Sequence, residues 1–116
     1  KKWEESNVVY VYNGRTKQNM PMYYQFYQDC NTNIKRFNIE AAISKLVIPH
    51  LHVHGDADPT VLVDHAYNLK KWNYQTDLHI IKDADHVFSA THPFNSECLP
   101  EDLKEAIDIT VNFLKC

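Results

Sequence analysis

In the first third of the chain, β-branched and aromatic residues gather in short runs between polar residues. Residues 7–12, with the sequence NVVYVY, are typical of a strand. The Asn13-Gly14 pair that follows predicts a turn, because both residue types tolerate positive φ. Residues 21–29 predict a short helix with Pro21 at its first position, where a missing N–H costs nothing.

From residue 38 onward the apolar positions recur more regularly, and they predict helix, strand, helix, strand and helix in that order. The expected elements are a helix capped by Asn38 with Ile39, Ala42, Ile43 and Leu46 on its apolar face, a strand over 47–53, a helix over 63–72, a strand over 78–81 and a helix opened by Pro100. The apolar residues expected on one face of the last helix are Leu103, Ala106, Ile107, Val111 and Leu114.

This order of elements predicts an α/β fold. Two strands joined by a helix should lie parallel through a right-handed crossover, with helices on the faces of the sheet. The chain divides into residues 1–37, a strand with an excursion, and residues 38–116, an α/β subdomain. Because these few strands make a thin sheet, we expect them to form the edge of a larger sheet.

Composition excludes several classes of protein. Twelve Lys and Arg against fifteen Asp and Glu leave a net charge of −3, too mild to indicate nucleic acid or an anionic membrane as partner. Only two glycines are present, so no glycine-rich phosphate loop can form. No apolar run is long enough to span a membrane. The cysteines Cys30, Cys98 and Cys116 form no paired motif and indicate reduced thiols in the cytoplasm.

Two loops that follow the predicted strands hold the candidate chemistry. Residues 54–61 read HGDADPTV and residues 83–88 read DADHVF, and both loops leave the sheet at its carboxyl edge, where α/β proteins bind ligands. A carboxylate from one loop could orient a histidine from the other. Seven histidines and fifteen acids also give many chance pairs, so residue type alone favours solvated loop residues.

A family resemblance changes this balance. Residues 48–61, IPHLHVHGDADPTV, closely resemble the acid-loop segment of α/β-hydrolases, and residues 78–88, LHIIKDADHVF, resemble their last strand and histidine loop. Residues 13–16 and 20–21 look more loosely like the excursion that such enzymes carry before these strands. The resemblance implies that Asp58 is the acid and His86 the base of a catalytic triad.

Neighbouring residues compete for these roles. Asp56 is the alternative acid, but Asp58 occupies the family's Asp position, three residues after Gly55. Asp85 should point away from the imidazole of its neighbour in sequence. We interpret His54 as a residue that orders the loop rather than as a catalytic one.

The nucleophile of such an enzyme precedes the acid in the chain. Here only Ser6, Ser44 and Cys30 are available, and none has the flanking glycines of the Gly-x-Ser-x-Gly elbow. The resemblance therefore implies the C-terminal part of a serine hydrolase that acts on small ester or peptide-like amide substrates, needs no cofactor and is inactive alone. We expect such a chain to associate with itself or with the missing N-terminal half.

Two other interpretations stay open. The chain could be a non-catalytic α/β module that binds a partner. His50, His52 and His54 share one face of the predicted strand and suggest a metal site, but alternate residues on a strand lie about 6.5–7 Å apart, too far to converge on one ion. We therefore expect no metal.

Overall fold

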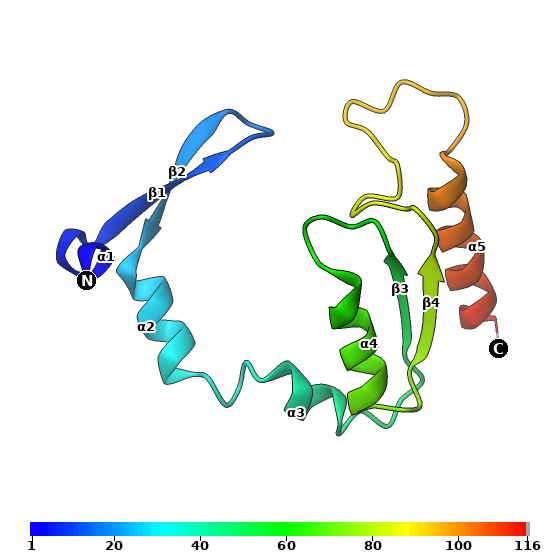
Figure 1. Cartoon of the computed structure of the whole chain (residues 1–116), viewed down its shortest axis with the longest axis horizontal. Coiled ribbons are helices and arrows are strands. Elements are labelled where there is room, and N and C mark those ends of the chain that lie inside the picture. Colours follow the sequence, from blue (N-terminus) through cyan, green and yellow to red (C-terminus); the bar gives the residue numbers. More distant parts are fainter. Residues whose placement is uncertain (116) are drawn as a thin grey trace. The chain divides into compact units, whose positions relative to one another are not determined.

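The computed structural model describes residues 1–115, which form two compact units (Figure 1). The first comprises Lys1–Ile39, and the second begins at Glu40. The chain is a small mixed α/β protein with an antiparallel hairpin in the first unit and a parallel strand pair in the second. Within the described residues, no helix has both the length and the apolar character needed to cross a membrane.

The hairpin of the first unit pairs β1 (Val8–Asn13) with β2 (Gln18–Tyr23). The predicted strand and the turn after it are confirmed. The turn closes on the Asn13 side chain, whose Oδ1 accepts the backbone N–H groups of Arg15 and Thr16 at 3.0 and 3.1 Å. Positive φ falls on Lys17 and not on Gly14, so this turn does not use the glycine's conformational freedom.

The helix predicted over residues 21–29 is wrong in its start. Pro21 lies within β2, opposite Tyr10, and helix α2 runs over Tyr24–Thr32. The Tyr24 N–H donates to the Asn7 carbonyl at 2.9 Å, so the hydrogen-bonded pairs alternate from there and Pro21 falls at a position where β1 needs no donor. Pairing with β1 therefore overrides the preference of proline for a helix start.

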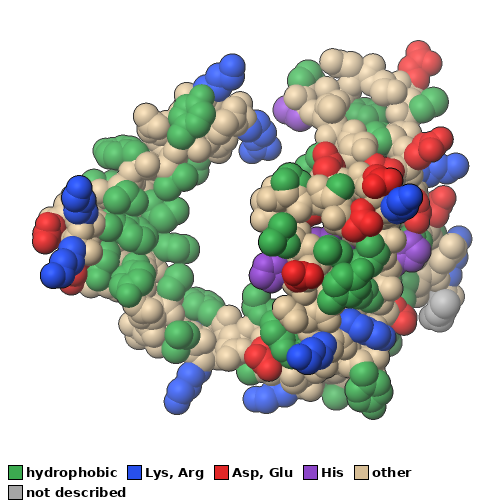
Figure 2. Space-filling view, in the orientation of Figure 1, with side chains coloured by type: hydrophobic (Ala, Val, Ile, Leu, Met, Phe, Trp, Pro, Cys, Tyr) green, Lys and Arg blue, Asp and Glu red, His purple; other side chains and the backbone are tan. Residues whose placement is uncertain are grey.

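A small aromatic cluster joins helix α1 (Lys2–Ser6) to α2. The rings of Trp3 and Tyr24 meet edge to face with centroids 5.8 Å apart, and Tyr24 stacks on Tyr27 at 5.3 Å. The indole N–H of Trp3 donates to the Met22 carbonyl at 2.9 Å. None of the residues in this unit is buried, and in the view of Figure 2 many of its hydrophobic side chains lie at the surface.

The second unit is built on the predicted crossover. Strand β3 (Leu51–Gly55) and strand β4 (Asp77–Ile81) are parallel and are joined by α4 (Val63–Trp72). Leu51 pairs with Asp77 and Gly55 with Ile81, so both strands end at the same edge. The first predicted helix is short: α3 covers only Ile39–Ile43.

Strand β3 begins four residues later than predicted. Val47 and Ile48 are exposed and unpaired with β4, since the ladder starts at Leu51. Pro49 has no N–H to donate to a ladder, and the first cross-strand bond, from the Asp77 N–H to the His50 carbonyl at 2.8 Å, lies after it. The apolar run alone therefore overestimated the strand.

The core of the second unit is small. Ile81, Ala84 and Ala106 are buried, with Val53 and Phe88 packed against them. Ala106 lies on α5 (Glu101–Leu114), whose exposed residues include Ile107, Val111 and Leu114. The helix is confirmed, and three residues of its predicted apolar face, Ile107, Val111 and Leu114, are exposed, since the two-stranded sheet covers only part of that face.

A buried asparagine ties the turn before β4 to the segment before β3. Asn73 Nδ2 donates to the carbonyls of Ile43 and Leu46 at 3.1 and 3.0 Å, and its Oδ1 accepts the Gln75 N–H at 3.0 Å. The amide therefore uses its nitrogen as a donor and its oxygen as an acceptor. The side chain substitutes for secondary structure where the chain is irregular.

We predict that Asn73→Ala lowers the free energy of unfolding by about 2–3 kcal/mol, because it removes the hydrogen bonds of a buried amide to the carbonyls of Ile43 and Leu46 and to the N–H of Gln75. Urea unfolding followed by circular dichroism measures the change. Asn95→Ala is the matched control, since Asn95 is exposed in the loop before α5 and its loss should change stability by less than about 0.5 kcal/mol. Equal effects of the two substitutions would contradict the structural role of Asn73.

Candidate functional site

The loops after β3 and β4 meet directly above the carboxyl edge of the sheet. The Asp56 N–H donates to the Ile81 carbonyl at 3.1 Å, and the Ala57 N–H donates to the Ala84 carbonyl at 3.0 Å. These bonds continue the strand pairing for two residues past the ladder. The two loops therefore hold a fixed position relative to each other.

Gly55 makes this approach possible. A Cβ at this position would overlap the Ala84 carbonyl and would also lie 2.9 Å from the Asp85 carbonyl oxygen. Gly55 and Ala84 are both buried. Here the glycine is required for lack of space and not for an unusual φ.

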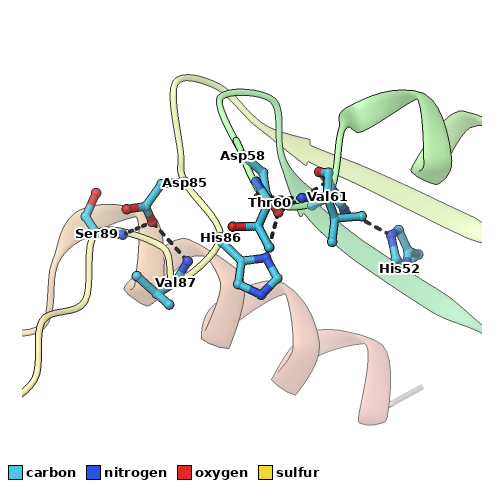
Figure 3. A network of polar contacts seen from close by, with 9 residues as sticks. His52, Asp58, Thr60, Val61, Asp85, His86, Val87 and Ser89 are labelled. Carbon is cyan, nitrogen blue, oxygen red and sulfur yellow. Dashed lines mark hydrogen bonds and ion pairs between the residues drawn. The ribbon is translucent and has the colours of Figure 1, made fainter. Parts of the chain in front are cut away.

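The approach brings together the two residues predicted to form the site. His86 Nδ1 lies 2.8 Å from Asp58 Oδ2, and because an ionised carboxylate only accepts, Nδ1 carries the proton (Figure 3). The Asp58 side chain is 4 % exposed, whereas that of His86 is 51 % exposed. The acid is thus enclosed, and the imidazole reaches the surface with Nε2 as its second ring nitrogen.

Backbone donors hold the other oxygen of the carboxylate. Asp58 Oδ1 accepts the N–H groups of Thr60 and Val61 at 2.7 and 2.9 Å, an arrangement that folds the loop around the side chain (Figure 3). Residue type alone did not reveal these two contributions, since both come from the backbone. The sequence Asp-Pro-Thr-Val was their only signal, as Asp commonly accepts N–H groups two and three residues ahead.

The environment keeps Asp58 charged. Burial acts to raise the pKa of its carboxyl group, but the hydrogen bonds from Val61, His86 and Thr60 and the charge of His86 outweigh it and lower the pKa from 3.8 to about 2. A carboxylate that stays ionised can accept from Nδ1–H and favour an imidazolium beside it.

Neither competing acid faces His86. Asp56 Oδ1 accepts the Asp83 N–H at 2.6 Å, and Asp85 Oδ1 accepts the N–H groups of Val87 and Ser89 at 3.0 and 2.9 Å. Both carboxylates shape the turn after β4. Asp58 is therefore the acid of these loops whose carboxylate contacts His86.

The loop after His86 is also tethered to the last helix. The Ser89 hydroxyl donates to Asp102 Oδ2 at 2.5 Å. Phe88 and Ser89 both have positive φ, at 54° and 59°. Sequence reasoning did not identify this tether, which depends on a contact between residues thirteen positions apart.

His50, directly before β3, and His52 and His54 within β3 are arranged as a row. His50 Nδ1 lies 3.1 Å from Thr76 Oγ1, His52 Nε2 lies 3.3 Å from His54 Nδ1, and His54 Nε2 lies 2.8 Å from the Val61 carbonyl. Burial, followed by the charges of His54 and His50, lowers the pKa of His52 below 6.5. Among residues 1–115, no group of three or more potential ligands is placed to hold a metal ion.

A hollow of about 260 Å³ lies beside the acid and the histidine. Val53, Val61 and Phe88 supply its apolar lining, and the ionisable residues of its lining are His52, His54, Asp58, Asp85 and His86. Sequence reasoning had not assigned Val53 or Phe88 to the site. Both also pack on the core, which links the shape of the hollow to the packing of the second unit.

The two serines considered as nucleophiles donate their hydroxyls to backbone carbonyls close to them in sequence. The Ser44 hydroxyl donates to the Glu40 carbonyl at 2.7 Å, and the Ser6 hydroxyl donates to the Val8 carbonyl at 2.8 Å. Cys30 belongs to the first unit and Cys98 to the exposed loop before α5; both are free thiols. Cys116 lies outside the described residues.

No protein-family model matches this chain, and no curated protein matches its sequence. The site is therefore defined by its own geometry.

We predict that Gly55→Ala lowers the free energy of unfolding by about 2–3 kcal/mol, since the added methyl group must displace the backbone at Ala84. Urea unfolding measures this loss. Gly14→Ala is the matched control, because a Cβ at Gly14 meets no atom within 4 Å and φ there is not positive. Its expected effect is neutral or stabilising by less than about 1 kcal/mol. A Gly55→Ala protein as stable as the Gly14→Ala protein would show that the loops can separate freely.

The lowered pKa of Asp58 predicts how stability depends on acid. A carboxyl group with a lower pKa in the folded state stabilises the fold above its unfolded pKa of 3.8, and this contribution is lost as the pH falls from there to about 2. Asp58→Asn should therefore flatten the pH dependence of stability in this window. Asp108→Asn, in the exposed part of α5, should keep the wild-type slope. Parallel slopes for wild type and Asp58→Asn would contradict the prediction.

Proposed function

We propose that this chain is the C-terminal part of an α/β-hydrolase and supplies the acid and the base of a Ser-His-Asp triad. Asp58 is the acid and His86 the base. A serine elsewhere in the intact enzyme is the nucleophile. The observation that carries the proposal is the 2.8 Å contact between Asp58 Oδ2 and His86 Nδ1 at the carboxyl edge of a parallel strand pair.

Three properties of the pair support a catalytic role. Its order along the chain, acid before histidine across one crossover, is that of the α/β-hydrolases. The bond to Asp58 uses Nδ1 and leaves Nε2 for proton transfer. The half-exposed ring of His86 lies beside an apolar hollow, where an acyl or leaving group can be held away from water.

The reaction follows from these positions. The serine oxygen attacks the carbonyl carbon of the substrate while His86 Nε2 takes the serine proton, and Asp58 stabilises the resulting imidazolium. The imidazolium then donates this proton to the leaving alcohol or amine as the acyl bond breaks. In the second half, His86 takes a proton from water, the hydroxide oxygen attacks the acyl-serine, and the proton returns to the serine oxygen as the acid product leaves.

The substrate class is a small carboxylic ester or a short peptide-like amide. The apolar side chains of Val53, Val61 and Phe88 in the lining of the hollow suit a short apolar group. The mechanism requires no cofactor. Fold resemblance by itself does not fix the reaction, so the assignment to ester or amide hydrolysis rests on the residue types at the site.

The surroundings of the strand pair favour a larger assembly. A two-stranded parallel sheet leaves a backbone edge unpaired on each strand. On α5, Ile107, Val111 and Leu114 expose apolar surface. We propose that the rest of the enzyme, or a second copy, covers these surfaces, and that the protein works in the cytoplasm, where the thiols of Cys30 and Cys98 stay reduced.

We predict that the chain alone hydrolyses a p-nitrophenyl ester no faster than an unrelated protein, and that joining it to an upstream coding segment with a Gly-x-Ser-x-Gly elbow gives activity. In the joined protein, His86→Ala and Asp58→Asn should each lower kcat by about 10³–10⁴-fold. Initial rates on the ester measure this loss.

Matched controls use the same residue types outside the site. His79→Gln removes a histidine that pairs with Glu105 on the outer surface of β4, and Asp64→Asn removes an exposed acid of α4. Both should keep the activity of the joined protein. Full activity after loss of His86 would overturn the proposal, and a folded but inactive joined protein would favour a non-catalytic binding module.

A further inference from the structure

The row formed by His50, His52 and His54 ends at the site. The contacts of His52 and His54 determine which of their ring nitrogens carry protons. A carbonyl oxygen only accepts, so His54 Nε2, at 2.8 Å from the Val61 carbonyl, carries a proton. In the neutral ring, His54 Nδ1 is then an acceptor. His52 Nε2, 3.3 Å away, must therefore be the donor to it.

The same row continues into the carboxylate. His54 holds the carbonyl of Val61, and the N–H of Val61 donates to Asp58 Oδ1 at 2.9 Å. With Oδ1 occupied, Oδ2 faces His86 at 2.8 Å (Figure 3). Four residues from β3 and its loop thus lead, bond by bond, to the imidazole on the loop after β4.

We infer that His54, oriented in turn by His52, is a positioning residue that holds Asp58 in the rotamer from which it binds His86. This inference rests on the proposed function, because it gives the row a part in preparing the triad. It assigns His54 no contact with substrate. The direct approach of His54 Nε2 to Asp58 Oδ2, at 3.7 Å, is too long for a hydrogen bond.

Burial explains why a histidine does this work. His54 is buried and both of its nitrogens are engaged, so its ring cannot turn without losing two hydrogen bonds. The loop that His54 holds contains Pro59. Burial and the neighbouring rings favour the neutral form of His52, which keeps His52 in the single-proton state that the donor role needs.

The titratable groups that face Asp58 are few. His86 and His54 lie nearest, and His52 and Asp85 line the same hollow. The pKa of Asp58 therefore reports on the positioning of its carboxylate, since three of the interactions that lower it are hydrogen bonds from Val61, His86 and Thr60.

The test uses the chain itself and needs no substrate. In His54→Phe, which removes the donor to Val61 but fills the space, the pKa of Asp58 measured from its carboxyl ¹³C shift should rise by about one unit from its value of about 2. The wild-type His86 Nδ1 proton, hydrogen-bonded to Asp58, should give a protected, downfield NMR signal, and His54→Phe should lose it. His54→Gln, whose side-chain amide can donate to the same carbonyl, should restore both.

Each result decides the inference. A folded His54→Phe protein with the wild-type Asp58 pKa and His86 signal would overturn it, and so would equal changes in His54→Phe and His54→Gln, which would assign the effect to packing. If His54→Phe does not fold, His52→Leu decides, because His52 is only partly buried. That variant should shift the Asp58 pKa and weaken the His86 Nδ1 signal in the direction expected for His54→Phe, because His54 loses the donor to its Nδ1. An unchanged Asp58 pKa and an unchanged His86 signal would overturn the inference.

Failure here and failure of the proposed function give different results. These NMR measurements concern only the positioning of Asp58 and His86 in the isolated chain. Hydrolysis by the joined protein tests the function. If the NMR results are as expected but the joined protein does not hydrolyse the ester, only the proposed enzyme function is contradicted. If the joined protein hydrolyses the ester but the Asp58 pKa does not change in the His54 variants, only the positioning role is contradicted.

Discussion

The close approach of two backbones at Gly55 governs the site of this protein. Parallel pairing of β3 and β4 brings both loops to one edge, but only a residue without a side chain lets the loop of Ala84 lie directly over the end of β3. Two backbone hydrogen bonds then lock the loops. The contact between Asp58 and His86 is a consequence of this approach, since neither side chain is long enough to cross a wider gap.

Much of the second unit could be predicted from the sequence because its signals are local. The helix over Val63–Trp72 follows from apolar spacing, and the parallel strands follow from the helix between them. The choice of Asp58 came from a family resemblance, and in the structure its Oδ2 lies 2.8 Å from His86 Nδ1. Two of the donors that lower the pKa of Asp58 are the backbone N–H groups of Thr60 and Val61, so residue type does not indicate them.

The errors have a common physical origin in long-range pairing. Pro21 is a good residue for the start of a helix, yet it pairs with Tyr10 of β1 and so becomes part of a strand. Val47 and Ile48 favour a strand, but a strand needs a partner, and β4 offers none beyond Asp77.

Proline in β2 also makes the two sides of the hairpin unequal. The register that pairs Pro21 with Tyr10 turns the ring nitrogen of Pro21 outward, where it has no hydrogen to offer. An additional strand pairing with that side of β2 would lack one backbone hydrogen bond, at Pro21. Strand β1 carries neither proline nor charge from Val8 to Asn13. The hairpin therefore resists growth in one direction and permits it in the other, a polarity set by a single imino acid.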